Sequence, residues 1–105
     1  MERLLALDEP PTAVVTSGES LALGALSACR TFGLRVPDDV ALVCFDDPPF
    51  GDLLDPPVTA LARNEEEMGR LAASLLLHAL QSTAAPPPAE VRLPLELVVR
   101  RSCGC

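Results

Sequence analysis

The sequence contains no lysine, no tryptophan and no tyrosine, and its 8 basic residues, all arginines, are outnumbered by 15 acidic ones. The formal net charge is therefore -7 at pH 7. A domain that binds nucleic acid by itself normally carries a basic face, because contacts with phosphates dominate its affinity. The longest basic run here is Arg100–Arg101, whereas the longest acidic run is Glu65–Glu67. We therefore expect no direct contact between these 105 residues and DNA.

Long apolar runs are also missing. No stretch approaches the ~20 apolar residues that span a bilayer, and Asp8 and Glu9 follow the first apolar residues too soon for a signal peptide. The 49% apolar content suffices for a packed core, which three phenylalanines leave mostly aliphatic. We expect a cytoplasmic protein that does not bind a membrane.

Histidine and cysteine are too few for a convincing metal site. The single histidine, His78, lies on the polar side of an expected helix. Cys29 and Cys44 stand among apolar residues and are expected to be buried as small hydrophobes. Cys103 and Cys105 alone do not supply the four ligands of a structural zinc site. We expect neither a metal ion nor a cofactor.

A strand, a helix and a second strand follow one another near the N-terminus. Residues 13–15 form a short apolar run, and Thr16 with Glu19 has the spacing of a capping box that begins a helix. The helix is expected to end near Phe32, because Gly33 follows. Residues 40–45 form a second continuous apolar run, expected to be a strand buried on both faces. This pattern predicts a βαβ unit with a parallel sheet.

The second half of the sequence predicts a loop, a short extended piece, a helix, a linker and a strand. Residues 46–57 contain four prolines and four aspartates and indicate the loop, and residues 58–62 the extended piece. Asn64 is expected to cap a helix over 65–81 whose apolar stripe has seven members. Residues 82–88 have the composition of a linker. Alternation over 91–99 predicts a strand with one buried face, with Pro94 at an edge.

Two loops lie where a parallel sheet binds ligands, beyond the carboxyl ends of its strands. The first is residues 16–19 and the second begins with Asp46 and Asp47. Structural roles are open for each: a turn cap for Asp46, the capping box for Glu19, and a loop contact for Asp47. A magnesium-dependent phosphoryl acceptor would also need a lysine, which is absent. No base is placed beside a serine or cysteine nucleophile, so we expect no enzyme.

Six segments, in order, resemble the LacI/GalR family of transcription regulators. They are residues 20–26 (SLALGAL), 33–40 (GLRVPDDV), 43–47 (VCFDD), 54–59 (LDPPVT), 67–69 (EMG) and 93–100 (LPLELVVR). The resemblance implies an α/β fold: a partial periplasmic-binding-protein-like (Rossmann-like) parallel sheet with flanking helices. It further implies that residues 1–105 are the C-terminal portion of a two-lobed core. Its parts would be a βαβ piece (10–59), a crossover helix and linker (60–90) and a returning strand (91–102).

The resemblance also implies a function and a set of residues. A small effector, a sugar or a nucleobase, would bind near Asp46, with Glu19, Gly18 and Ser17 on the neighbouring loop. Gly18–Glu19 stand where the family has an Asn-Asp pair. Dimerisation would involve Leu23, Leu53 and Leu54. The alternative is a stand-alone small-ligand-binding or protein-interaction module.

Partners follow from the same resemblance. Operator DNA would be contacted only through a DNA-binding domain that lies outside these residues. The apolar stripe of the 65–81 helix would need a sheet to cover it, so we expect a homodimer or another self-associated form, including exchange of elements between two chains.

Overall fold

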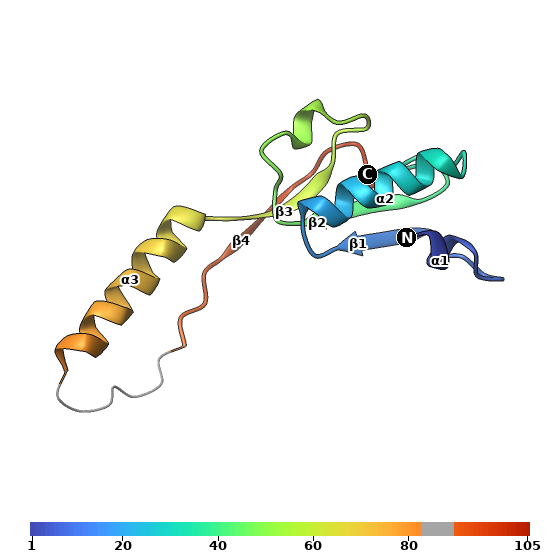
Figure 1. The fold of residues 1–105 in the computed structure, drawn as a ribbon. Helices are drawn as coiled ribbons and strands as arrows, with labels where there is room; N and C mark the ends of the chain where they lie inside the picture. The colour runs from blue at the N-terminus through green and yellow to red at the C-terminus, as the bar shows by residue number, and fades with distance from the viewer. Residues whose placement is uncertain (83–89) are drawn as a thin grey trace. The chain divides into compact units, whose positions relative to one another are not determined.

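The computed structural model describes residues 1–82 and 90–105, and most of the expected 82–88 linker lies outside them. The elements are α1 (Glu2–Leu5), β1 (Ala13–Thr16), α2 (Glu19–Thr31), β2 (Ala41–Phe45), a 3-10 turn η1 (Gly51–Leu53), β3 (Thr59–Arg63), α3 (Glu65–Gln81) and β4 (Leu95–Val98) (Figure 1). They fall into two units. Unit 1 comprises Met1–Ala62 with Glu96–Cys105, and unit 2 comprises Arg63–Leu95.

The sheet has the strand order β1-β2-β3-β4. β1 runs parallel to β2, with Thr16 opposite Cys44, and β2 runs parallel to β3, with Phe45 opposite Leu61. Figure 1 shows α2 alongside β1 and β2, the two strands that it connects. The predicted βαβ unit and the α/β fold with a parallel sheet are therefore confirmed.

Small residues line the buried side of α2. Ala22, Ala25, Ala28 and Cys29 are all buried, which lets the helix backbone approach the sheet closely. Ala22 joins a core cluster completed by Cys44, Val58 and Ala60. The burial expected for both Cys29 and Cys44 is thus confirmed.

Gly33 ends α2 as its position in the sequence predicts. Its φ of 70° lies in the left-handed region that glycine adopts without steric penalty. The Gly33 N–H donates to the Arg30 carbonyl at 3.2 Å, and the Leu34 N–H donates to the Cys29 carbonyl at 2.8 Å. These two bonds form a Schellman motif, which satisfies carbonyls that the helix end would leave exposed.

Two expectations about the first half were wrong. The capping box does not form, because Thr16 is the last residue of β1 and its hydroxyl donates to the Val43 carbonyl at 3.5 Å. Gly18 is the N-cap instead. The second strand is also not buried on both faces: Leu42 and Cys44 are buried, whereas Phe45 is 37% exposed. α2 packs on the face that carries Cys44 and leaves the opposite face more open.

Unit 1 resumes at Glu96, and residues after β4 hydrogen-bond to its sheet. Ser102 is completely buried. Its Oγ donates to the Leu42 carbonyl at 2.6 Å and accepts from the Thr59 N–H at 2.9 Å. Its own carbonyl accepts from the Leu42 N–H at 2.7 Å. Ser102 therefore joins β2 to the start of β3 through polar contacts.

Unit 2 contains α3, the helix that the apolar stripe predicts. Asn64 caps it, with its Oδ1 accepting from the Glu67 N–H at 2.9 Å, as expected. No residue of α3 is buried. One side of α3 faces Val91 and Leu93 across a cavity of about 230 Å³, also lined by Met68, Leu71, Ala72 and Leu75. His78 is exposed, as its place on the polar side predicts.

The last strand differs from its prediction. β4 is only four residues long, and Leu95 and Leu97, expected on a buried face, are 48% and 56% exposed. The alternation identified the strand, but none of the residues described here covers that face. Among all the residues that the structure describes, no helix has both the length and the apolar character needed to cross a membrane.

Candidate ligand site at the carboxyl edge of the sheet

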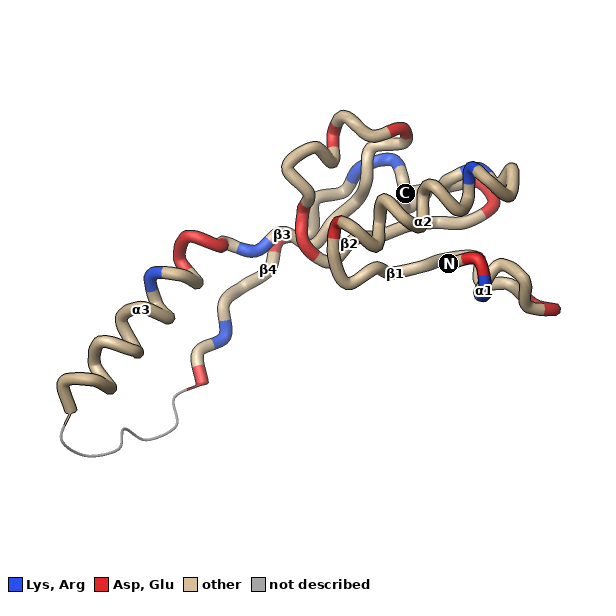
Figure 2. The backbone as a smooth tube through the Cα atoms, viewed as in Figure 1, with Lys and Arg blue, Asp and Glu red and all other residues tan. Residues whose placement is uncertain are grey.

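The structure brings the expected ligand-binding residues to one edge of the sheet. β1 ends at Thr16 directly opposite Cys44, so the two strands finish within about one residue of each other. Ser17 and Gly18 follow β1, and Asp46 follows β2. Figure 2 shows the acidic segment after β2 close to the acidic first turn of α2. This edge is where parallel sheets bind ligands.

Asp46 has an unusual backbone conformation. Its φ is 76°, the only positive value found at a residue other than glycine in the described parts of the chain. Aspartate tolerates this region better than most residues, at a cost of about 1 kcal/mol or more. The Asp46 N–H donates to the Leu61 carbonyl at 3.1 Å, which continues the contact between β2 and β3. The backbone of Asp46 is therefore held on the sheet, and its half-buried side chain extends from a fixed position.

The start of α2 supplies a second set of polar groups. Gly18 is the N-cap in an extended conformation, with no side chain to accept from the first turn. The first N–H groups of a helix have no partner within the helix, and they suit polar or anionic ligands. Ser17 and Glu19 are both exposed on this segment. Donors and acceptors thus lie side by side at one edge.

Asp47 has a structural role, as one of the sequence interpretations held. Arg100 Nη1 and Nη2 donate to its two carboxylate oxygens at 2.6 and 2.9 Å. Arg100 Nη1 also donates to the Val58 carbonyl at 2.7 Å, and Arg100 Nε donates to Asp52 at 2.5 Å. We call these four groups the Arg100 clamp. It ties the loop after β2 to the start of β3.

The clamp places a cation beside the candidate site. The Arg100 side chain is only 12% exposed, and its hydrogen bonds with Asp47, together with those to Asp52, raise its pKa above the usual range. Both Asp47 carboxylate oxygens are hydrogen-bonded to the Arg100 guanidinium. This pairing argues against a magnesium site formed by Asp46 and Asp47. No group of three or more potential metal ligands occurs among the residues described.

Gly51 lies against the clamp. A Cβ at this position would stand 3.2 Å from both Arg100 Nη1 and the Asp47 carboxylate. The glycine therefore lets the backbone of η1 approach the ion pair, and any larger residue would push on it.

The residues expected at a dimer interface lie in different surroundings. Leu23 is 38% exposed on α2 and Leu53 is 87% exposed in η1. Leu54 is half-buried and packs against the core cluster of unit 1.

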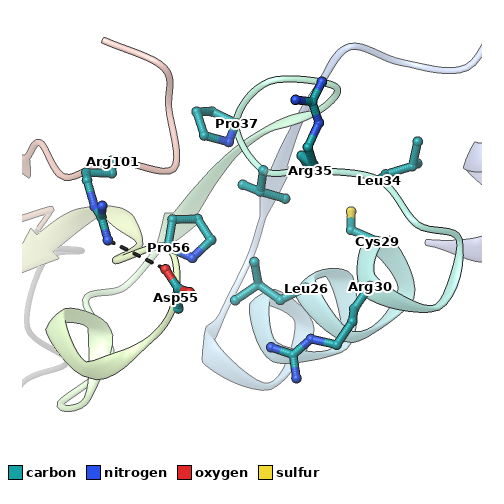
Figure 3. Close-up of a pocket in the computed structure, with 10 residues that line it drawn as sticks. Leu26, Cys29, Arg30, Leu34, Arg35, Pro37, Asp55, Pro56 and Arg101 are labelled. Carbon is teal, nitrogen blue, oxygen red and sulfur yellow. Dashed lines mark ion pairs between the residues drawn. The ribbon is translucent and has the colours of Figure 1, made fainter.

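A cavity of about 390 Å³ lies at the opposite end of unit 1, toward the starts of β2 and β3, and the sequence reasoning did not find it. Leu26, Cys29, Leu34, Val36, Pro37 and Pro56 line it together with Arg30, Arg35, Asp55 and Arg101 (Figure 3). Arg101 pairs with Asp55 at 3.5 Å. Arg35 is hydrogen-bonded to Asp39 and turns away from the cavity in Figure 3. The lining comes from residues 26–37, 55–56 and 101, which lie apart in the sequence, so spacing gave no signal.

Comparison with known proteins identifies the family. Residues 1–103 match the periplasmic binding protein-like domain. The HTH-type transcriptional repressor CytR of Escherichia coli (strain K12) is 38% identical over 102 residues, which are 97% of this chain and 30% of that protein. The chain thus spans less than a third of this relative.

Solved structures agree. A LacI transcriptional regulator from Bacillus cereus subsp. cytotoxis superposes with a TM-score of 0.85 at 31% identity, over 97% of this chain and 36% of that one. The transcriptional regulator CelR in complex with cellobiose gives a TM-score of 0.77 at 35% identity, over 87% of this chain and 28% of that one. The chain therefore belongs to the periplasmic binding protein-like domain family, in the form that LacI/GalR regulators carry.

Proposed function

We propose that this chain is the effector-binding and dimerisation region of a LacI/GalR-type transcription regulator, that it is not an enzyme, and that its effector is a small polyhydroxylated molecule of the sugar class. The observation that carries the proposal is the register of β1 and β2, which sets Asp46 beside the uncapped start of α2. A carboxylate can accept from two sugar hydroxyls, and free helix N–H groups can donate to others. The related CelR was solved with cellobiose.

Specificity would come from the residues on this edge. Asp46 would hold the effector from a backbone fixed between β2 and β3. Glu19 would add a second acceptor, while Gly18 and Ser17 would leave room for a ligand near the N–H groups of α2. A nucleobase would compete for the same donors and acceptors, and a ligand panel distinguishes it from a sugar.

Thermal unfolding in the presence of a ligand panel tests the site. The panel contains glucose, cellobiose, adenine and cytidine, each far above micromolar concentration. We expect one sugar to raise the melting temperature of the wild-type chain, and Asp46→Ala to abolish the increase. Asp8→Ala, which removes an exposed carboxylate from the N-terminal segment, is the matched control and should retain it. If no compound shifts the wild type, the proposal fails.

For dimerisation, Leu23 and Leu53 would contact a second subunit directly, with Leu54 holding the loop to the core from inside. Leu53 is 87% exposed and Leu23 is 38% exposed, so both side chains are available to a partner surface. The apolar side of α3 would add a second contact. The division into parts at 10–59, 60–90 and 91–102 belongs to the same proposal.

Analytical ultracentrifugation tests self-association at micromolar concentration. We expect dimers or larger species for the wild type and a shift toward monomer for Leu53→Glu. Leu7→Glu, at another exposed leucine, should not dissociate them. A clean wild-type monomer would contradict the proposal.

Contact with operator DNA would belong to a helix-turn-helix domain outside these 105 residues, and the regulator would act in the cytoplasm. With a net charge of -7, the chain itself should not retard DNA in a gel at physiological salt. Retardation by the isolated chain would count against this assignment of roles.

A further inference from the structure

Two thiols stand together at residues 103–105. Cys103 and Cys105 are both free, the first half-buried and the second exposed. Gly104 between them has a φ of 77°, so the backbone turns sharply at that residue. The Cys105 N–H donates to Cys103 Sγ at 3.4 Å. The turn therefore folds the second cysteine back onto the sulfur of the first.

Cys103 is held firmly by unit 1. The residue before it, Ser102, is completely buried between β2 and β3. The Cys103 thiol itself donates to the Arg100 carbonyl at 3.4 Å. One thiol of the pair is thus anchored on the sheet, while the other is open to solvent.

The surroundings of the four cysteines differ in chemistry. Hydrogen bonds from the Thr59 side chain, and then from Cys105, lower the pKa of Cys103. Burial raises the pKa of both Cys29 and Cys44. The thiolate is the form of cysteine that attacks disulfides, so these environments favour reaction at Cys103 over the two buried thiols.

Cys105 has the properties of a resolving thiol. Its pKa is raised by the hydrogen bond and the charge of Cys103. That effect disappears once the Cys103 sulfur is bonded to another sulfur and carries no charge. Cys105 therefore becomes a better nucleophile just when Cys103 has reacted. Low-pKa, accessible cysteines next to a resolving cysteine are typical of redox-sensitive sites.

We infer that Cys103 and Cys105 form a thiol–disulfide exchange site that reacts with low-molecular-weight disulfides and closes to an intramolecular disulfide. The Cys103 thiolate attacks one sulfur of the small disulfide, which forms a mixed disulfide and releases one small thiolate. The Cys105 thiolate then attacks Cys103 Sγ, which forms the Cys103–Cys105 bond and releases the second. The protein loses two electrons and two protons, and the small disulfide gains both as two thiols. This site is independent of the proposed effector site.

Redox titration of the 105-residue chain tests the inference. The chain is equilibrated with defined mixtures of reduced and oxidised glutathione, free thiols are trapped with N-ethylmaleimide, and the products are mapped by peptide mass spectrometry. We expect a Cys103–Cys105 disulfide that dithiothreitol reverses. Cys105→Ser should instead accumulate glutathione on Cys103, because no resolving thiol remains. Cys103→Ser should form neither product.

Cys29→Ser is the matched control and should exchange like the wild type. In the wild type, Cys103 should react on the order of tenfold or more faster than Cys29. Circular dichroism of each variant checks that the fold is retained, and Cys105→Ser, at an exposed residue, is the variant least able to disturb it. The inference is wrong if residues 103–105 stay reduced in excess oxidised glutathione, if Cys29 or Cys44 reacts equally fast, or if disulfides form only between chains.

Discussion

The Thr59 N–H donates to Ser102 Oγ at 2.9 Å, although 43 positions separate the two residues. The same oxygen donates to the Leu42 carbonyl, so one buried hydroxyl satisfies a group on each of two strands. The Ser102 hydroxyl thus links β2 and the start of β3 in the way that a backbone hydrogen bond between the strands would.

Ser102→Ala should remove both bonds and leave two buried backbone groups without them. We expect a loss of about 2–3 kcal/mol in the free energy of unfolding, since an unsatisfied buried group costs about 1–3 kcal/mol. Urea denaturation followed by circular dichroism measures it. Ser20→Ala, at an exposed position of α2, should change stability by less than about 0.5 kcal/mol. Equal effects of the two substitutions would contradict the role given to Ser102.

The Arg100 clamp should contribute more to the stability of the fold than the ion pair between the adjacent Arg101 and Asp55. Arg100→Ala leaves the Asp47 carboxylate, 25% exposed, without its cation. We expect the free energy of unfolding to fall by about 2–3 kcal/mol. Breaking a fully buried ion pair costs ~3–5 kcal/mol, and the loss should be smaller here because Asp47 and Asp52 are partly open to water. Arg101→Ala is the matched control. Its pair with Asp55 spans 3.5 Å between side chains that are 72% and 93% exposed, so the loss should stay within about 1 kcal/mol.

Two glycines of the α2 region should respond to alanine in opposite directions. Gly33 has a φ of 70°, so Gly33→Ala should destabilise unit 1 by about 1 kcal/mol. Gly24 lies inside α2, and apart from the neighbouring backbone of the helix itself no atom lies within 4 Å of the position of a Cβ. Gly24→Ala should stabilise the helix by about 0.5–1 kcal/mol. Thermal melts of both variants under one set of conditions compare them, and the same sign for both would disprove the interpretation.

Alkylation by iodoacetamide should rank the cysteines by environment. Because the pKa of Cys103 is lowered, its thiolate fraction at neutral pH exceeds that of an ordinary exposed thiol. Its reaction should slow only as the pH falls through that lowered pKa. Cys29 and Cys44, with raised pKa values and buried side chains, should react only when urea unfolds the chain. Peptide mass spectrometry at several pH values measures each rate, and early labelling of Cys44 would contradict the ranking.

Local patterns predicted most of the secondary structure. The apolar run before Asp46 became β2, the stripe after Asn64 became α3, and Gly33 ended α2, because each depends on neighbours within a few positions. Thr16 shows where such patterns compete. It fits both the end of a strand and a capping box, and in the structure it is the last residue of β1, paired opposite Cys44 of β2.

The polar contacts across unit 1 could not be predicted in this way. Arg100 reaches Asp47 across 53 positions and Ser102 reaches Leu42 across 60. No periodicity joins residues so far apart, and all of unit 2 lies between them in the chain. The placement of Asp46, in contrast, follows from one rule about the ends of parallel strands together with the family resemblance.

The contacts of Ser102 can form only late in the synthesis of the chain. β2 and β3 leave the ribosome well before the segment that joins them, because all of unit 2 is synthesised in between. Until residue 102 emerges, the Leu42 carbonyl and the Thr59 N–H have only water as a partner for these contacts. A nascent chain halted near residue 95 would therefore contain every strand of the βαβ unit and still lack the contact that closes its sheet.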